Sequence, residues 1–195
     1  MGTRGLCGFV VDGDVKSSYN HFDSYPSGLG ADIVKQIGYL TKNFSEDDLK
    51  QKVRDMFFVD DDSTPVTEEY IEKYKEYYDG NVGGSTEVTW YQLLRDAQGD
   101  LVKNIEAGVM IDSNDFARDS LFCEWGYLVN LDTKMLEVYS GFQKTSHADG
   151  RFADPDFTPN GEFRYYPIRL VEEFPFNDIP DMKEWEESLY EEEDE

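Results

Sequence analysis

The sequence predicts an α+β fold, in which N- and C-terminal hairpins form an antiparallel or mixed sheet and the middle of the chain is helical. Apolar, β-prone runs occur near both ends, at 6–20 and 123–139. Between them, apolar residues recur at helical spacing. With 195 residues the chain can bury a core without staples. We therefore expect a single α+β domain over 1–180 and an acidic C-terminal tail over 181–195.

The N-terminal hairpin is the first predicted element. Leu6–Val11 is apolar and β-prone, and Val15–Asn20 follows it. Between them lies Asp12-Gly13, a dipeptide that suits the positive φ angles of a tight turn. The two segments are therefore expected to pair as antiparallel strands.

Helices are predicted through the middle of the chain. The first covers 29–40, where apolar residues lie on one helical face. A capping-box-like start at 45–48 predicts a second, which ends near Met56. A third is expected to begin near Pro65 and to end at Gly80. Shorter helical stretches are predicted at 89–97, 101–107 and 113–116.

The clearest strand pair is predicted after the helices. Cys123–Leu131 and Met135–Tyr139 are joined by a short polar turn. The polar stretch 143–162 is rich in Gly, Pro and Asp, which indicates a long loop. Phe163–Val171 is predicted as a further strand, which Pro167 restricts to an edge or a bulge.

The tail differs in character from the rest of the chain. Residues 181–195 hold nine acids and one lysine. Because like charges in a block repel, a frayed or disordered tail is expected. Trp185 and Leu189 are spaced to pin its first turn to the body.

The charge limits the classes of partner. The chain has 42 Asp and Glu against 18 Lys and Arg, a formal charge of −24. Such a field repels nucleic acid and anionic lipid but attracts basic protein surfaces. The expected partner is therefore a basic surface of a host protein, with no direct nucleic acid and no membrane. Solubility or adaptation to high salt is the alternative explanation.

The cysteines and the hydropathy predict a cytoplasmic protein. A secreted disulfide scaffold would hold more cysteines than Cys7 and Cys123, so both are expected to be reduced and partly buried. No N-terminal signal segment is evident, and no apolar run approaches the ~18 residues that span a membrane.

One segment, 19–30, concentrates residues that suit a ligand site. His21 titrates near neutral pH, and Asp23 is placed to fix its tautomer. Glycines would leave helix N-terminal amides open to an anion, with Arg4 supplying positive charge. The more common alternative is a structural loop, since these residue types also build tight turns. The ligand-binding candidates are Arg4, Tyr19, Asn20, His21, Asp23, Tyr25, Gly28 and Gly30.

The acidic clusters do not predict a metal site. Asp60-Asp61-Asp62 resembles the start of a calcium loop, but Pro65 and Ile71 stand where glycine and a bidentate glutamate are required. No metal and no cofactor are therefore expected. The carboxylates predicted to contact a basic partner are Asp60, Asp61, Asp62, Glu191, Glu192, Glu193 and Asp194.

Cys7-Gly8-Phe9 resembles the start of amidotransferases that use an N-terminal nucleophile. In those enzymes the cysteine uses its own α-amine as base. Six residues precede Cys7, so the amine would exist only after cleavage at Leu6. The pattern therefore favours a buried structural cysteine over a nucleophile.

The chain also resembles an uncharacterised family of phage and bacterial proteins. The resemblance is carried by the Met1-Gly2-Thr3-Arg4-Gly5 start and the 19–30 motif, and it covers most of the chain except the tail. It implies a phage or mobile-element setting and no particular activity.

Three functions are compatible with these observations. The first is an acidic interaction protein, such as a phage-encoded inhibitor or nucleic-acid mimic with an anti-defence role. The second is a binder or sponge for a small anionic ligand such as a nucleotide, using the loop from His21 to Gly30. The third is a hydrolase built on His21 and Asp23, although a non-enzymatic role is favoured.

Overall fold

The computed structural model describes residues 2–83, 86–162 and 164–193, and it confirms the α+β fold class. Its main sheet is mixed and has the strand order β2-β1-β5-β6-β7. The strands span Gly5–Val11 (β1), Asp14–Asn20 (β2), Trp125–Asn130 (β5), Met135–Ser140 (β6) and Arg169–Pro175 (β7). β1 is parallel to β5, and the other neighbours are antiparallel. The first and last parts of the chain therefore share one sheet.

The turn between β1 and β2 also joins the two halves of this sheet. Asp12 and Gly13 take φ angles of 54° and 82°, which the tight turn requires. The Asp132 carboxylate, in the turn between β5 and β6, accepts hydrogen bonds from their N–H groups at 3.0 and 2.9 Å. Each turn therefore helps to hold the other.

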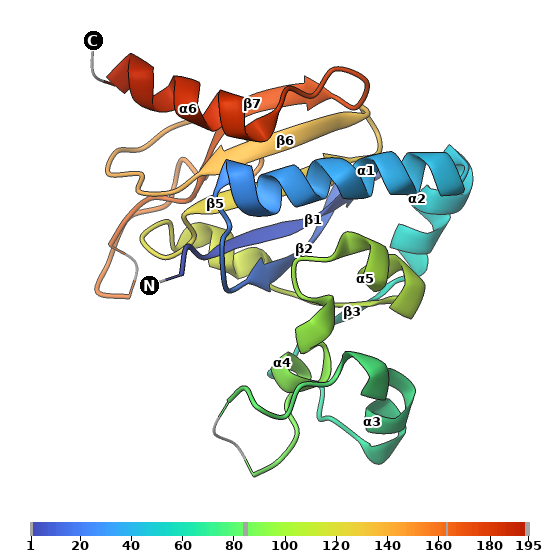
Figure 1. The fold of residues 1–195 in the computed structure, drawn as a ribbon. Coiled ribbons are helices and arrows are strands. Elements are labelled where there is room, and N and C mark those ends of the chain that lie inside the picture. The colour runs from blue at the N-terminus through green and yellow to red at the C-terminus, as the bar shows by residue number, and fades with distance from the viewer. Residues whose placement is uncertain (1, 84–85, 163, 194–195) are drawn as a thin grey trace.

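Helices cover one face of the sheet (Figure 1). They are Ala31–Asn43 (α1), Glu46–Asp55 (α2), Leu101–Ala107 (α5) and Met182–Glu193 (α6). Ile33 and Ile37 of α1 share a buried cluster with Phe9 and Val129 of the sheet. This is the apolar stripe that the spacing over 29–40 predicts. Before α1, Pro26–Gly30 forms one π-helical turn.

The opposite face of the sheet is covered by irregular segments. Leu6 and Leu128 pack there against Ala117 and Ile168. The short 3₁₀ helix Asn114–Arg118 and the long segment after β6 supply this cover. The sheet is therefore buried on both faces near its centre, which explains the unbroken apolar character of β1.

A small lobe, residues 57–97, extends from the main sheet (Figure 1). It begins with Phe57–Val59 (β3), which pairs in parallel with Val109–Ile111 (β4). It continues through helices Glu68–Tyr74 (α3), Lys75–Tyr77, Trp90–Leu93 (α4) and Arg95–Ala97. Tyr74, Trp90 and Leu93 form its core.

Two predicted elements start later than expected. The third helix begins at Glu68, not near Pro65, because the Thr67 hydroxyl accepts a hydrogen bond from Tyr70 N–H and caps it there. The last strand begins at Arg169, because Pro167 has no N–H to donate. It is the edge strand, as Pro167 predicts, and Phe163 lies outside the described residues.

The acidic tail differs from the prediction of a frayed segment, because residues 182–193 form α6. Asp181 caps this helix by accepting hydrogen bonds from the N–H groups of Lys183 and Glu184. Met182 is buried, and Trp185 packs against the sheet, as its spacing predicts. The apolar contacts of the first turns offset the charge repulsion that dominated the sequence-based expectation.

A buried ion pair holds the segment after β6 on the sheet. Glu137 of β6 is 2% exposed, and Arg151 donates to both of its oxygens at 2.8–3.0 Å. The side chains of Tyr139 and Asn130 also donate to it, both at 2.7 Å. These bonds outweigh the effect of burial, which alone would raise the carboxyl pKa, and they lower the pKa of Glu137.

Within the described residues, no helix has both the length and the apolar character needed to cross a bilayer.

Candidate functional site

Several residues of the 19–30 motif have structural roles. The Asn20 side chain is nearly buried and donates to the Phe22 carbonyl and the Ser24 hydroxyl at 2.6 and 2.9 Å. The Tyr127 hydroxyl, from β5, donates to the Ser24 carbonyl at 2.9 Å. These contacts hold the loop against the sheet, as the structural alternative for the motif predicts.

The glycines of the motif allow close backbone packing. A Cβ at Gly28 would lie 2.3 Å from the Asp23 carbonyl oxygen, and one at Gly30 would lie 3.0 Å from the Tyr127 ring. Asp23 itself is exposed and has a φ of 53°. Tyr25 lines a different cleft, beneath α6. These four candidates shape the loop or lie elsewhere.

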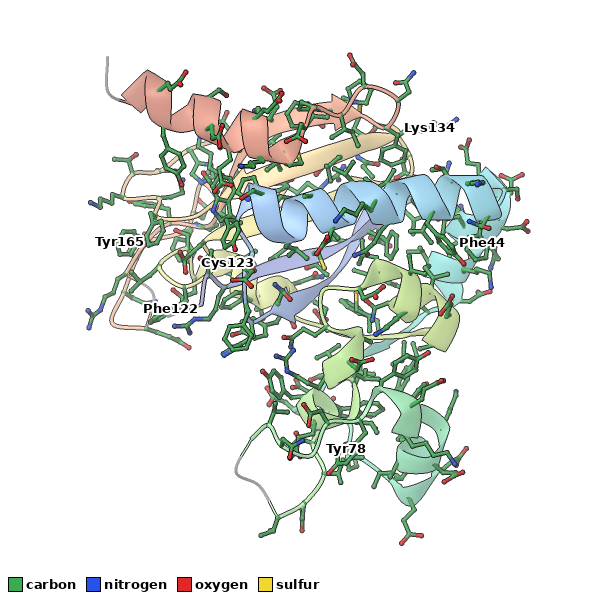
Figure 2. The ribbon with its side chains drawn as sticks, in the orientation of Figure 1. Phe44, Tyr78, Phe122, Cys123, Lys134 and Tyr165 are labelled. Carbon is green, nitrogen blue, oxygen red and sulfur yellow. The ribbon has the colours of Figure 1, made fainter. Side chains whose placement is uncertain are left out.

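The other candidates, Arg4, Tyr19 and His21, come together. The Tyr19 hydroxyl and His21 Nδ1 are 2.6 Å apart. Asp23, the predicted partner of His21, makes no hydrogen bond with it among the described contacts. The guanidinium of Arg4 lies 4.7 Å from the ring centre of Phe122, which Figure 2 labels on the segment before β5. Arg4 is also close enough to act electrostatically on both Tyr19 and His21.

Arg95 joins this group from the small lobe. Its Nη1 donates to Gln98 Oε1 at 2.8 Å, and the same oxygen accepts the His21 backbone N–H at 3.1 Å. Its guanidinium lies 5.7 Å from the Tyr91 ring centre and 5.9 Å from that of Phe22. The Arg95 Nε is buried and has no hydrogen-bond partner among the described residues.

The electrostatics of this cluster are locally positive. Burial lowers the pKa of His21, and the charges of Arg95 and Arg4 lower it further. Burial raises the pKa of Tyr19, while the same two arginines oppose that rise. We call Arg4, Tyr19, His21 and Arg95 the cationic cluster. Its positive field contrasts with the net charge of −24.

A cleft of about 260 Å³ adjoins the cationic cluster. Tyr19, Tyr91 and Phe116 supply aromatic walls, and Gln98 links the cleft to Arg95. Asp61, one of the predicted partner-binding acids, also lines it. Burial and the neighbouring carboxylates raise the Asp61 pKa. The cleft therefore offers flat apolar surfaces beside cationic donors.

Arg95, Tyr91, Gln98 and Phe116 were not predicted as site residues. They belong to segments far along the chain from the 19–30 motif, and no local pattern marks them. One feature could have marked Arg95 as a site residue, because the chain has only 18 Lys and Arg. In such a chain a half-buried arginine is notable. That signal appears only once burial is known.

The remaining predicted acids that the structure describes belong to two separate segments, the loop after β3 and α6. Asp60 accepts hydrogen bonds from the Ser63 hydroxyl and the Asp62 N–H, so it shapes its own loop. Glu191 is exposed on α6, and Figure 1 shows α6 on the opposite side of the main sheet from the small lobe that follows β3. Glu192 and Glu193 continue α6, and Asp194 lies outside the described residues. Among the described residues, no group of three or more His, Cys, Asp and Glu is placed to hold a metal ion.

Cys7 is not placed for nucleophilic chemistry. It is 1% exposed in the middle of β1, and burial raises the pKa of its thiol to about 12. A thiol at neutral pH then remains protonated, whereas catalysis needs the thiolate. Cys123 is also free and buried, so both cysteines are more deeply buried than the partial burial that the sequence predicted.

Comparisons with protein-family models, with curated proteins and with solved structures give no match to this chain.

Proposed function

We propose that this protein binds a small organic anion, with a nucleotide as the leading class, at the cationic cluster and its adjoining cleft. The observation that carries the proposal is the buried Arg95 Nε, which lies near His21 and Arg4 and has no hydrogen-bond partner among the described residues. A buried donor without an acceptor is costly, and an anion would supply one. Burial lowers the pKa of His21, and the positive charges of Arg95 and Arg4 lower it further.

The donor types match phosphate or carboxylate oxygens. Guanidinium groups form charge-assisted, often bidentate hydrogen bonds with such oxygens. Arg4 belongs to the segment immediately before β1, and Arg95 belongs to the small lobe. An anion bound by both arginines would bridge the N-terminal segment and the small lobe, which Gln98 otherwise links at this place.

The aromatic walls favour a planar group attached to the anion. Tyr19, Tyr91 and Phe116 border the cleft next to the cluster. Stacking of a base on aromatic side chains contributes about 1–3 kcal/mol per base. A mononucleotide combines both features, with its phosphate at the arginines and its base in the cleft.

Thermal unfolding with three ligands tests this function. Inorganic phosphate and adenosine monophosphate should raise the melting temperature, and the nucleotide should act at lower concentration. A ligand at 100 times its Kd stabilises the folded state by about 2.7 kcal/mol. Adenosine alone should have a smaller effect, since it lacks the anion.

Two variants make the test specific. Arg95→Gln and Arg4→Gln should each weaken binding by about tenfold or more, because each removes a charge-assisted hydrogen bond. Arg164→Gln is the matched control, since Arg164 is exposed and carries the same charge. The proposed site would be refuted by an equal loss of affinity in Arg164→Gln. It would also be refuted if ligand still raised the melting temperature of Arg95→Gln.

A second candidate function is an acidic interaction protein that binds a basic surface, in the manner of a phage-encoded inhibitor or nucleic-acid mimic. Its support is the exposed acidic side of α6, which includes Glu184, Glu187 and Glu191. Immobilised protein should retain basic proteins at about 0.05 M salt and release them at about 0.5 M. Retention that is unchanged by salt, or by glutamine at these three positions, would argue against it.

A further inference from the structure

A second cleft, of about 850 Å³, lies between α6, the start of β5 and the segment after β6. We call it the α6 cleft. Its walls include the aromatic side chains of Tyr25, Trp125, Phe142 and Tyr190 and the carboxylates of Glu124 and Glu186. It takes no residue of the cationic cluster into its lining, so it is a separate feature of the molecule.

The aromatic walls are partly open to solvent. Phe142 is 51% exposed and Tyr190 is 59% exposed, although both are large apolar or amphipathic groups. Trp125 is half-buried and makes a T-shaped contact with Trp185, with ring centres 6.3 Å apart. Solvent-exposed aromatic groups gathered in a hollow are typical of a surface that another molecule covers.

The two carboxylates are held in place by backbone groups. Glu124 Oε1 accepts the Arg4 N–H at 3.3 Å, and Glu186 Oε2 accepts the Ser27 N–H at 3.0 Å. Both side chains belong to half-buried residues, and neither forms an ion pair within the part of the chain that the structure describes. No lysine or arginine appears among the lining residues of this cleft.

From this arrangement we infer that the α6 cleft binds an arginine side chain presented by a partner protein. Partly desolvated carboxylates without a counter-ion favour a cation. Aromatic faces also attract cations, most strongly over tryptophan. Both features of the cleft therefore select the same kind of group, and they select against acidic or purely apolar segments.

Arginine fits these walls better than lysine. Its planar guanidinium stacks on aromatic rings and bonds carboxylates in a fork, whereas the lysine ammonium is a compact and strongly hydrated charge. With Trp125 as a stacking surface and Glu124 and Glu186 as acceptors, a guanidinium can use both properties at once. This interaction surface goes beyond the proposed anion binding and does not depend on it.

The probe for a test is N-acetylarginine amide, titrated into the intact protein at about 0.15 M salt to screen long-range attraction. The Trp125 indole N–H resonance in a nitrogen–proton NMR spectrum reports occupancy, because Trp125 lines the cleft. A saturable shift is expected. The neutral isostere N-acetylcitrulline amide should not cause it, and N-acetyllysine amide should bind more weakly.

Paired variants separate the cleft from the overall charge. Glu124→Gln with Glu186→Gln should weaken arginine binding by about tenfold or more, since it removes two charged acceptors. Glutamine keeps the size of each side chain and can still accept the backbone N–H bonds. Glu69→Gln with Glu173→Gln removes the same charge from exposed positions and should change affinity by less than about twofold.

Three results would overturn the inference. They are a shift that does not saturate, an equal shift with citrulline, and an equal loss of affinity in both variant pairs. Lysine binding as tight as arginine would refute the guanidinium preference. Phosphate and nucleotide titrations on the same samples report the cationic cluster separately, so failure of one proposal leaves the other testable.

Discussion

At the scale of single residues, His21 is the group most sensitive to an anion in the cationic cluster. Its pKa lies below the ordinary value of 6.5, because burial and the charges of Arg95 and Arg4 disfavour the protonated ring. The folded state therefore binds fewer protons than the unfolded chain just below pH 6.5. The contribution of His21 to the stability of the fold therefore decreases as the pH drops from 6.5 through the lowered pKa.

Bound phosphate should reverse this shift. We expect the pKa of His21 to rise when inorganic phosphate is added, because the ligand supplies negative charge, and phosphate affinity should increase as the pH falls through it. Proton NMR of the imidazole measures both effects. At constant pH, added phosphate should leave the His147 resonances unchanged, because that ring lies elsewhere, 2.8 Å from the Pro167 carbonyl oxygen. A His21 titration that ignores phosphate would contradict binding at this place.

Two glycines provide a matched test of backbone packing. Gly28→Ala should cost about 3 kcal/mol, because the new Cβ would meet the Asp23 carbonyl oxygen at 2.3 Å. Gly38→Ala, at an exposed position of α1 where the new Cβ would meet no described atom within 4 Å outside the adjoining backbone, should stabilise by about 0.5–1 kcal/mol. Urea unfolding of the two variants checks both signs. Equal effects would mean that the loop adapts to a side chain.

The ion pair between Glu137 and Arg151 gives a pH-dependent prediction. Arg151→Ala should cost about 3 kcal/mol at pH 7, because it leaves a buried carboxylate without its cation. The pKa of Glu137 is lowered in the wild type, so this stabilisation is present above the ordinary glutamate pKa of 4.5. It is lost as the pH falls through the lowered value.

Unfolding in urea at pH 7 and in mild acid measures that dependence. Arg169→Ala is the control, because its pair with Asp149 is about half exposed on both sides and should contribute less than about 1 kcal/mol. If Arg151→Ala lowers the free energy of unfolding as much in mild acid as at pH 7, the cause is lost packing and not the lost ion pair.

At the scale of elements, α6 depends on a few contacts in its first half. The Trp185 ring meets Phe174 edge-on at 5.5 Å and also packs against Trp125. Trp185→Ala should therefore cost about 3 kcal/mol, near the low end for a buried tryptophan because Trp185 is half-buried. Glu187→Ala, at an exposed position of the same helix, should change stability by less than about 0.5 kcal/mol.

The Trp185→Ala variant also reports whether α6 stays packed against the sheet. Release of the helix should increase amide hydrogen exchange across 182–193, since exchange follows local opening. Thermal unfolding and exchange together then distinguish a loosened helix from a general loss of stability. A Trp185→Ala protein with normal exchange in α6 would show that other contacts hold it.

At the scale of the whole molecule, the net charge of −24 is the dominant property. Like charges destabilise the compact state, and salt screens them over about 10 Å at 0.1 M. We therefore expect added sodium chloride, up to about 0.5 M, to raise the melting temperature by about 3 °C for each kcal/mol gained. Sorbitol at equal osmolality is the control. A salt effect no larger than that of sorbitol would exclude screening as its cause.

Local chemistry made several elements predictable. The Asp12-Gly13 turn, the Ser45 cap of α2 and the Thr89 capping box of α4 each act within a few residues. Short strands hold too few residues to show the alternating apolar pattern of a strand. β3 and β4, with three residues each, were not predicted. β3 and β4 are strands because they pair with each other, although they are far apart in the chain. Sequence periodicity cannot report such a distant partner.

By itself the sequence determined the charge and the fold class, and it placed Arg4, Tyr19 and His21 among its candidate ligand-binding residues. Only the tertiary structure decided that β1 lies beside β5, that Gln98 links Arg95 to His21, and that α6 covers an aromatic, acidic cleft. Turns and caps are set by neighbours along the chain. A site, in contrast, depends on contacts between distant segments, which packing of the whole chain selects.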